Sequence, residues 1–517
     1  MRRAGILMPI TALPSPWGVG TMGAEARSFI DFLAEAGVSV WQVLPIVPTS
    51  YGDSPYQSFS TYAGNPYLID LDDLAAEGLL DRAEYAGRTW SSQADRVDYG
   101  ALYEARFDVL ARAARRLASM HPDEFYAFCK REASWLDDYA LFMALKEAHG
   151  DASWNTWEAA LRHRQPVELA RARMELADRV RFWQAVQCLF FRQWESLRIY
   201  ARTAGIRIMG DLPFYVALDS ADVWAHPEQF QLDEELRPTE IAGVPPDGFS
   251  AIGQIWGNPL FAWDRMKAEG YAWWIDRISF QLRLYDILRI DHFRGFDSYF
   301  AIPTGAATAA GGRWRKGPGK ALFQALRLAV GDVSIVAEDL GYLTPSVRQL
   351  LDDTGFPGMK VLEFAFDTRD SEAGDDTYLP FAYPENSVAY VGTHDNDTAL
   401  GWLANAPAPD TRTAREYLRL DDREGEGWGM MRGIWASASE LAVVQMQDVL
   451  ELGSEARINT PSTLGGNWTW RARPGFASRS LAARLRHQLH LYHRIPADEA
   501  RVATAANGAA EPTSKED

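Results

Sequence analysis

The chain has 517 residues and a formal net charge of −18, and 47% of its residues are hydrophobic while 24% are charged. This composition is typical of a globular protein with a large core, and it excludes a mainly disordered chain. The negative charge would repel a polyanion over most of the surface, so we expect no nucleic-acid partner. No apolar run approaches the ~18 residues that span a bilayer, so we expect no membrane partner.

The two ends of the chain and its cysteines indicate a cytoplasmic protein. The N-terminal segment MRRAGILMPITALPSP lacks the long apolar region of a signal peptide. Cys129 and Cys188 each stand among aromatic and aliphatic residues, which favours two reduced thiols. Residues 503–517 are rich in Ala, Ser, Thr, Pro and acids, so we expect a disordered tail that follows a single domain over 1–502.

The first elements of the chain predict an α/β architecture. Residues 25–37 have the pattern of an amphipathic helix that ends at Gly37, and an apolar strand follows at 38–45. The segment 50–70 is dense in turn-forming residues and Tyr, which predicts an ordered loop. Residues 72–200 then carry helical patterns with no strand between them, so we expect a mainly helical insertion.

Four later strand-like runs each end in an acid. The runs cover 206–211, 284–291, 333–338 and 388–395, and they end at Asp211, Asp291, Glu338 and Asp395. Apolar runs rich in Val and Ile are typical of buried parallel strands, whose carboxyl ends meet on one face of a barrel. Acids repeated at that face indicate carboxylates that converge on one pocket, usually for chemistry or for a metal, because like charges repel. The alternative is that each acid caps a following helix.

Two further strands are expected at 359–366 and 456–460, and helical patterns lie between the strands. This alternation predicts a parallel α/β barrel with long loops after its strands. One of these loops, a loop-rich insertion at 212–283, is expected to lie over the cleft.

The acids suit glycoside chemistry, which needs one carboxylate as nucleophile or base and one carboxylic acid to protonate the leaving oxygen. Arg289 lies two residues before Asp291 on the same side of its strand, so we expect this cation to keep Asp291 ionised. Glu338 follows an apolar strand, where burial would raise its pKa toward that of a working acid. His394 and Asp395 could bind sugar hydroxyls, and the carboxylate could offset positive charge at the anomeric centre. Many aromatic residues in loops also suit a sugar ligand.

Several motifs together resemble the 4-α-glucanotransferases, also called amylomaltases or disproportionating enzymes, which are glycoside hydrolase family 77 of the α-amylase clan. The resemblance runs from about Gly5 to Arg471. The motifs are GDSPYQSFS, AGNPYLIDL, WLDDYALFMALK, GDLPFYVALDSADVW, GQIWGNP, RIDHFRGF, VAEDLG, GTHDND and GNWTWR. It implies one catalytic (β/α)8 TIM barrel with inserted, mostly helical subdomains in its βα loops. It also implies retaining transfer of α-1,4-glucan segments between maltooligosaccharide chains.

The resemblance also assigns roles to residues. The family's nucleophile falls on Asp291, its acid/base on Glu338 and its transition-state carboxylate on Asp395. Substrate-binding positions fall on Ser54, Tyr56, Asp211, Phe249, Trp256, Arg289 and His394. The loop 245–259 matches the family's mobile loop over the cleft, but Gly248 stands where the family usually has Tyr, so a stacking contact would be lost.

Two other functions stay open at this point. A hydrolase would use the same acids with water as the acceptor, whereas a glucan-binding protein on an inactive barrel would not need all three acids. Asp70, Asp72 and Asp73 lack the spacing of a known calcium loop, and we expect no metal and no cofactor. We expect a monomer or a weak homo-oligomer.

Overall fold

The computed structural model describes residues 2–246, 252–341, 343–368 and 376–496. Its centre is a parallel sheet of eight strands in the order β10-β11-β12-β1-β2-β3-β6-β9. The strands are β1 (Arg3–Leu7), β2 (Val40–Gln42), β3 (Arg207–Leu212), β6 (Ile287–Ile290), β9 (Ile335–Ala337), β10 (Gly358–Val361), β11 (Ser387–Tyr390) and β12 (Leu441–Gln445).

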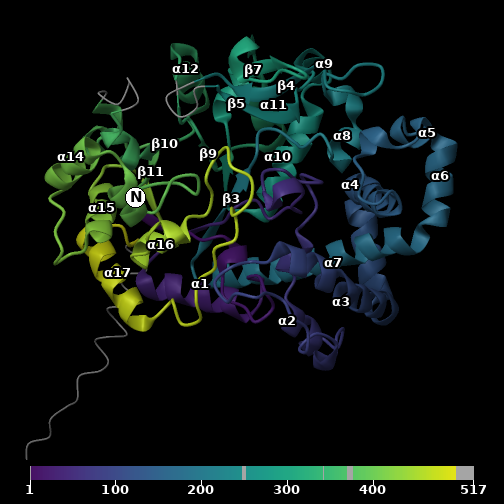
Figure 1. Ribbon diagram of the computed structural model, residues 1–517, viewed down its shortest axis with the longest axis horizontal. Coiled ribbons are helices and arrows are strands. Elements are labelled where there is room, and N and C mark those ends of the chain that lie inside the picture. The colour runs from purple at the N-terminus through teal and green to yellow at the C-terminus, as the bar shows by residue number, and fades with distance from the viewer. Residues whose placement is uncertain (1, 247–251, 342, 369–375, 497–517) are drawn as a thin grey trace, which may run out of the picture.

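The two edges of this sheet meet, so that it forms a barrel. The amide of Ala337, at the end of β9, donates to the carbonyl of Pro357 just before β10 at 2.9 Å. Helices such as α1 (Ala24–Ala36), α10 (Ala272–Leu284) and α12 (Pro345–Thr354) connect the strands around it. The predicted (β/α)8 barrel is therefore confirmed (Figure 1).

The barrel strands are buried along nearly their whole length, which explains their continuous apolar sequences. Every residue of strands β6, β9 and β11 is buried. Strands covered on both faces have apolar sequences of this kind. The acids of the sequence lie at or just beyond the carboxyl ends of such strands.

The long connection between β2 and β3 contains most of the helices outside the barrel. Helices α3 (Tyr99–Met120) and α4 (Pro122–Ala148) pack against α7 (Ala177–Thr203), and α5 (Ala159–Arg162) and α6 (Pro166–Glu175) complete the group. Figure 1 shows α3 to α6 beside the barrel. The division of the chain into an insertion at 72–200 and another at 212–283 remains a prediction.

A second sheet is built from the loops that follow β3 and β6. Its strand order is β5-β4-β7-β8, and all its pairs are antiparallel. The strands are β4 (Glu240–Val244), β5 (Gln254–Pro259), β7 (Ser298–Pro303) and β8 (Arg313–Lys316). Because loops after barrel strands start at their carboxyl ends, this sheet belongs to the face that carries the acids.

One predicted strand is wrong. Residues 456–460 do not belong to the barrel, because a 3-10 turn at Ser454–Ala456 is followed by irregular chain. The barrel is instead completed by β1 and β12, which the sequence patterns did not reveal. Across the described ranges, no helix has the length and apolarity to cross a membrane. The tail at 503–517 lies outside the described residues.

Candidate active site

The fold brings together the acids that end the barrel strands. Asp211 is part of β3, Asp291 follows β6 and Glu338 follows β9, and these three strands are direct neighbours in the barrel. Asp395 lies in the loop after β11. The prediction that these carboxylates meet at one face of the barrel is therefore confirmed.

A buried guanidinium joins two of these acids. Arg289 donates from Nη1 to both carboxylate oxygens of Asp211 at 2.7 and 2.6 Å, and from Nη2 to Asp291 Oδ1 at 3.0 Å. Tyr56 donates its hydroxyl to Asp211 Oδ2 at 2.8 Å. The Asp211 side chain is fully buried, whereas 30% of the Asp291 side chain is exposed. Asp291 is therefore the member of this group that can reach a substrate.

The pKa of Asp291 is set mainly by burial and not, as expected, by the charge of Arg289. Burial raises the pKa of Asp291 to about 6, and the Arg289 guanidinium opposes this rise but does not cancel it. The carboxylates of Asp211 and Asp395 act in the same direction as burial. Asp291 is still mostly ionised at neutral pH, as a nucleophile must be.

Glu338 has the opposite protonation state at neutral pH. Burial, followed by the negative charge of Asp291, raises the pKa of Glu338 to about 8. Two backbone amides nonetheless orient the carboxyl: His292 N donates to Oε2 at 2.7 Å and Leu340 N donates to Oε1 at 2.8 Å. An acid that keeps its proton beside an ionised partner is the arrangement of a general acid and a nucleophile.

Asp395 is held by the irregular segment that was predicted as a strand. Asn459 donates its side-chain amide to Asp395 Oδ1 at 2.6 Å, and Arg457 donates to the Asp395 backbone carbonyl at 2.7 Å. His394 Nε2 lies 3.4 Å from the same Oδ1, and 47% of the Asp395 side chain is exposed. The carboxylate is thus fixed at one oxygen, while nearly half of the side chain stays exposed.

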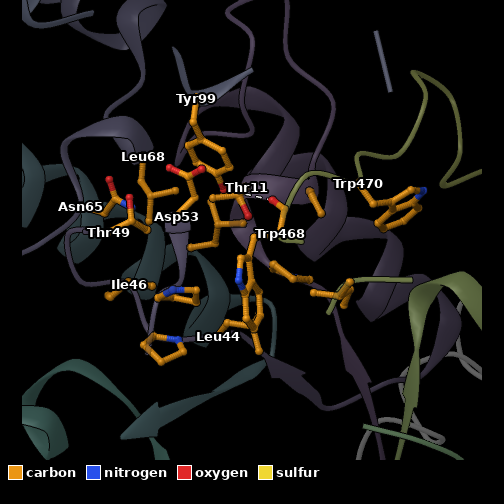
Figure 2. Close-up of a pocket in the computed structure, with 16 residues that line it drawn as sticks. Thr11, Leu44, Ile46, Thr49, Asp53, Asn65, Leu68, Tyr99, Trp468 and Trp470 are labelled. Carbon is orange, nitrogen blue, oxygen red and sulfur yellow. Dashed lines mark hydrogen bonds between the residues drawn. The ribbon is translucent and has the colours of Figure 1, made fainter. Parts of the chain in front are cut away.

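The rings of Tyr56, His394 and Trp468 form an aromatic cluster beside the acids. These two rings are stacked, with centroids 5.1 Å apart and planes 11° from parallel. Trp468 is tilted against both, at 5.7 Å from Tyr56 and 6.0 Å from His394. Trp468 also lines a cavity of about 30 Å³, where Tyr99 donates its hydroxyl to the Trp468 carbonyl at 3.0 Å (Figure 2).

The remaining predicted substrate-binding residues lie in different surroundings. Trp256, on β5, meets the ring of His292 edge-on at 4.9 Å, which places it beside the nucleophile candidate. Ser54 accepts a hydrogen bond from the amide of Tyr56 at 3.2 Å, so its hydroxyl supports the turn that carries Tyr56. Phe249 and Gly248 lie outside the described residues.

Sequence reasoning missed two side chains that shape the site. His292 has a left-handed backbone with φ 49°, which aims its amide at Glu338, and burial lowers the pKa of its imidazole to about 3. Asn459 was missed because its segment was predicted as a strand. His292 could have been found from its position, because it directly follows Asp291, the acid at the end of its strand.

Among the residues that the structure describes, no group of three or more His, Cys, Asp or Glu side chains could hold a metal ion. The acids of the site instead contact the guanidinium of Arg289, the amide of Asn459 and backbone N–H groups.

Comparisons with known proteins identify the family of this chain. The family model described as 4-alpha-glucanotransferase, glycoside hydrolase family 77, matches residues 8–477. The chain is 50% identical to a 4-alpha-glucanotransferase of Thermus thermophilus, over 96% of this chain and 99% of the relative. It is 45% identical to that of Clostridium butyricum, over 94% of this chain and the whole relative.

A solved structure is similar over nearly the whole molecule. The amylomaltase of Streptococcus agalactiae, solved in complex with acarbose, has a TM-score of 0.93 and is 40% identical, with 96% of this chain and 100% of that chain covered. With these matches, the chain belongs to the 4-α-glucanotransferase family, glycoside hydrolase family 77.

Proposed function

We propose that this protein transfers a segment of an α-1,4-glucan to the 4-hydroxyl of glucose or of another glucan, with retention at the anomeric carbon. The observation that carries the proposal is the pair of acids at neighbouring strand ends, Asp291 ionised and Glu338 protonated near neutral pH. The names of the full-length relatives support the same activity, and the acarbose bound by the similar amylomaltase supports a maltooligosaccharide-like ligand.

In the first step, a carboxylate oxygen of Asp291 attacks the anomeric carbon of the donor. The glycosidic bond breaks, and Glu338 gives its proton to the departing glucan oxygen. In the second step, Glu338 takes the proton of an incoming 4-hydroxyl, which attacks the anomeric carbon and releases Asp291. Two inversions at one carbon give net retention, and no cofactor takes part.

The other residues serve this exchange by position and charge. Arg289 stabilises the ionised form of Asp291 and holds Asp211 in place. The half-exposed carboxylate of Asp395 can bind sugar hydroxyls and stabilise the positive charge that develops at the anomeric centre. The partly exposed ring of Tyr56 supplies a surface for the donor sugar, and the buried ring of His394 stacks against it.

Product analysis separates transfer from hydrolysis. We expect maltotriose, incubated with the protein, to give glucose together with a ladder of longer maltooligosaccharides. The number of reducing ends should stay nearly constant, because each transfer breaks one glycosidic bond and forms another. Shorter sugars alone, with a steady gain of reducing ends, would show a hydrolase.

We expect Trp256→Ala to raise the fraction of donor that is hydrolysed. The indole of Trp256 stands edge-on to His292 beside the nucleophile candidate, so its loss would open the intermediate to water and weaken acceptor binding. The ratio of reducing ends gained to glucose released from maltotriose measures the effect. Trp314→Ala is the matched control, since Trp314 is an exposed Trp on β8 of the same small sheet. Equal ratios in the two variants would contradict a role for Trp256 in excluding water.

We expect a bell-shaped pH dependence of kcat/KM between the values of about 6 for Asp291 and about 8 for Glu338. The rate rises with pH as Asp291 loses its proton, and it falls at higher pH as Glu338 loses the proton that the leaving group needs. The two limbs belong to the interacting pair rather than to single residues. With a donor that needs no protonation, Glu338→Gln should keep the acid limb and lose the alkaline limb. A persisting alkaline limb would assign it to another group.

We further propose that the protein acts in the cytoplasm as a monomer or a weak homo-oligomer. Its two cysteines, Cys129 and Cys188, are free thiols rather than a disulfide, as is usual in a reducing compartment.

A further inference from the structure

Another buried acid, Glu363, packs against the loop that carries Asp395. Glu363 is in the 3-10 segment Leu362–Phe366 directly after β10, and only 2% of the residue is exposed. Its amide donates to the carbonyl of Val391 at 3.2 Å, and its Oε1 lies 3.0 Å from where a Cβ on Gly392 would be. The carboxyl is therefore packed against the start of the loop after β11.

Hydrogen bonds connect Glu363 to the backbone of Asp395. The side chain of Asn396 lies beside the Glu363 carboxyl, since Asn396 Cβ and Glu363 Oε1 lie 2.9 and 3.0 Å from where a Cβ on Gly392 would be. A hydrogen bond from Asn396 acts to lower the pKa of Glu363, against the larger effect of burial. The side-chain oxygen Oδ1 of Asn396 in turn accepts from Thr393 N at 3.0 Å and from Thr393 Oγ1 at 2.9 Å. The amide of Asp395 donates to Thr393 Oγ1 at 3.3 Å. Because the Asn396 oxygen accepts both bonds from Thr393, its amide nitrogen is the group that reaches Glu363.

The charges around Glu363 favour its neutral form. After burial, the carboxyls of Asp448 on α16 (Met446–Val449) and of Asp397 in the loop after β11 raise the pKa of Glu363, and the charge of Arg457 lowers it. Burial also raises the pKa of Asp448, to about 7. Among the described residues, Glu363 has no ion-pair partner and its Oε1 has no hydrogen-bond partner. Burial and the two acids raise the pKa of Glu363 well above its ordinary range. A carboxyl in this position keeps its proton because an unpaired buried charge is costly.

We propose that Glu363 is a positioning residue for Asp395, which it holds through the side chain of Asn396 and the turn at Thr393. This inference rests on the proposed role of Asp395 in the transfer reaction. Glu363 accepts the Asn396 amide, Asn396 orders Thr393, and Thr393 fixes the turn that carries His394 and Asp395. The residue itself acts only through this turn.

Two substitutions of similar size, Glu363→Gln and Glu363→Leu, test whether Glu363 acts as a hydrogen-bond acceptor or is needed simply as a buried acid. Glu363→Gln keeps a neutral side chain with a carbonyl oxygen for Asn396, so it should keep kcat within about threefold. Glu363→Leu keeps volume but removes the acceptor, so Asp395 loses its orientation and kcat should fall about 10–100-fold. KM for maltotriose should change less than kcat, because Tyr56 is held outside this turn by the hydrogen bond that its hydroxyl donates to Asp211. Glu132→Leu, which removes a buried acid of α4 outside the site, is the control and should leave kcat unchanged.

A double-mutant cycle with Asp395→Asn tests whether Glu363 acts through Asp395. If it does, Glu363→Leu should cost little more than about threefold once Asp395 is already Asn, although it costs far more in the unmodified chain. Independent, multiplying losses would overturn the proposal, as would a Glu363→Gln variant as slow as Glu363→Leu. Thermal unfolding of each variant shows that the comparison is between folded proteins.

The same variants distinguish a failure of this inference from a failure of the proposed function. An inactive Asp395→Asn with a fully active Glu363→Leu would leave Asp395 in its role and remove Glu363 from it. A fully active Asp395→Asn would refute the role of Asp395, and with it the inference for Glu363.

Discussion

Asp291→Asn is expected to abolish glucan transfer, with kcat on maltotriose lower by about 10⁴-fold or more. The amide is nearly isosteric with the carboxylate but is a far weaker nucleophile, so the covalent intermediate cannot form. Its side-chain oxygen can still accept the hydrogen bond that Arg289 Nη2 donates to Asp291 Oδ1 at 3.0 Å. The buried pair of Arg289 and Asp211 is unchanged, so the fold around the site should persist.

A measurement of glucan binding shows whether the loss of transfer comes from the chemical step or from weaker binding. Calorimetry with maltoheptaose should give a Kd within about tenfold of the unmodified value, because the aromatic surface of the site remains. Asp286→Asn is a matched control. Asp286 precedes the same strand β6 at the opposite end of the barrel, where residues serve stability rather than chemistry. An Asp291→Asn variant with substantial transfer activity would show that another carboxylate is the nucleophile.

Much of the barrel could be predicted because its strands are buried on both faces. The predicted runs that contain β3, β6, β9 and β11 are largely apolar, and each run ends in an acid. Strand β1, by contrast, contains Ala and Gly, and β12 ends at Gln445, so neither run ended in an acid. Residues 456–460 were misread because five residues are too few for periodicity to separate a strand from a loop.

In the site, too, local features of the sequence could be predicted, whereas contacts between distant segments could not. The acids could be predicted because residue type and position at a strand end are local features of the sequence. The raised pKa of Glu338 could also be predicted, from the apolar strand before it. The pKa of Asp291 could not, since burial there outweighs the opposing charge of Arg289. The contacts of Asn459 with Asp395 and of Asn396 with Glu363 also depend on how separate loops pack.

Glu338→Gln is expected to show a loss that depends on the leaving group of the donor. With maltotriose, kcat should fall about 10²–10⁴-fold, because the departing glucan oxygen needs the proton that Glu338 supplies. With α-maltotriosyl fluoride, Asp291 can still attack the anomeric carbon, since fluoride departs with little protonation. The first step should therefore proceed at a rate close to that of the unmodified protein.

The second step of this variant lacks its base, and this makes the intermediate observable. An incoming 4-hydroxyl is poorly activated without Glu338, so the fluoride donor should release about one equivalent of fluoride rapidly and then react slowly. The trapped sugar should be found by mass spectrometry on the tryptic peptide Ile290–Arg294, which contains Asp291. Added azide, which attacks without a base, should restore turnover and give an azide product of retained configuration.

The control for these experiments is Asp339→Asn, which alters the neighbouring buried acid that accepts a hydrogen bond from Met359 N at 2.6 Å. Any loss in that variant should be the same for maltotriose and for the fluoride donor, because Asp339 does not face the leaving group. If Glu338→Gln were equally slow with both donors, Glu338 would not be the leaving-group acid. If it released fluoride but labelled a peptide other than Ile290–Arg294, the nucleophile would lie elsewhere. The predicted combination of a rapid burst, a label on Asp291 and rescue by azide is expected only if the two acids divide the reaction as their protonation states indicate.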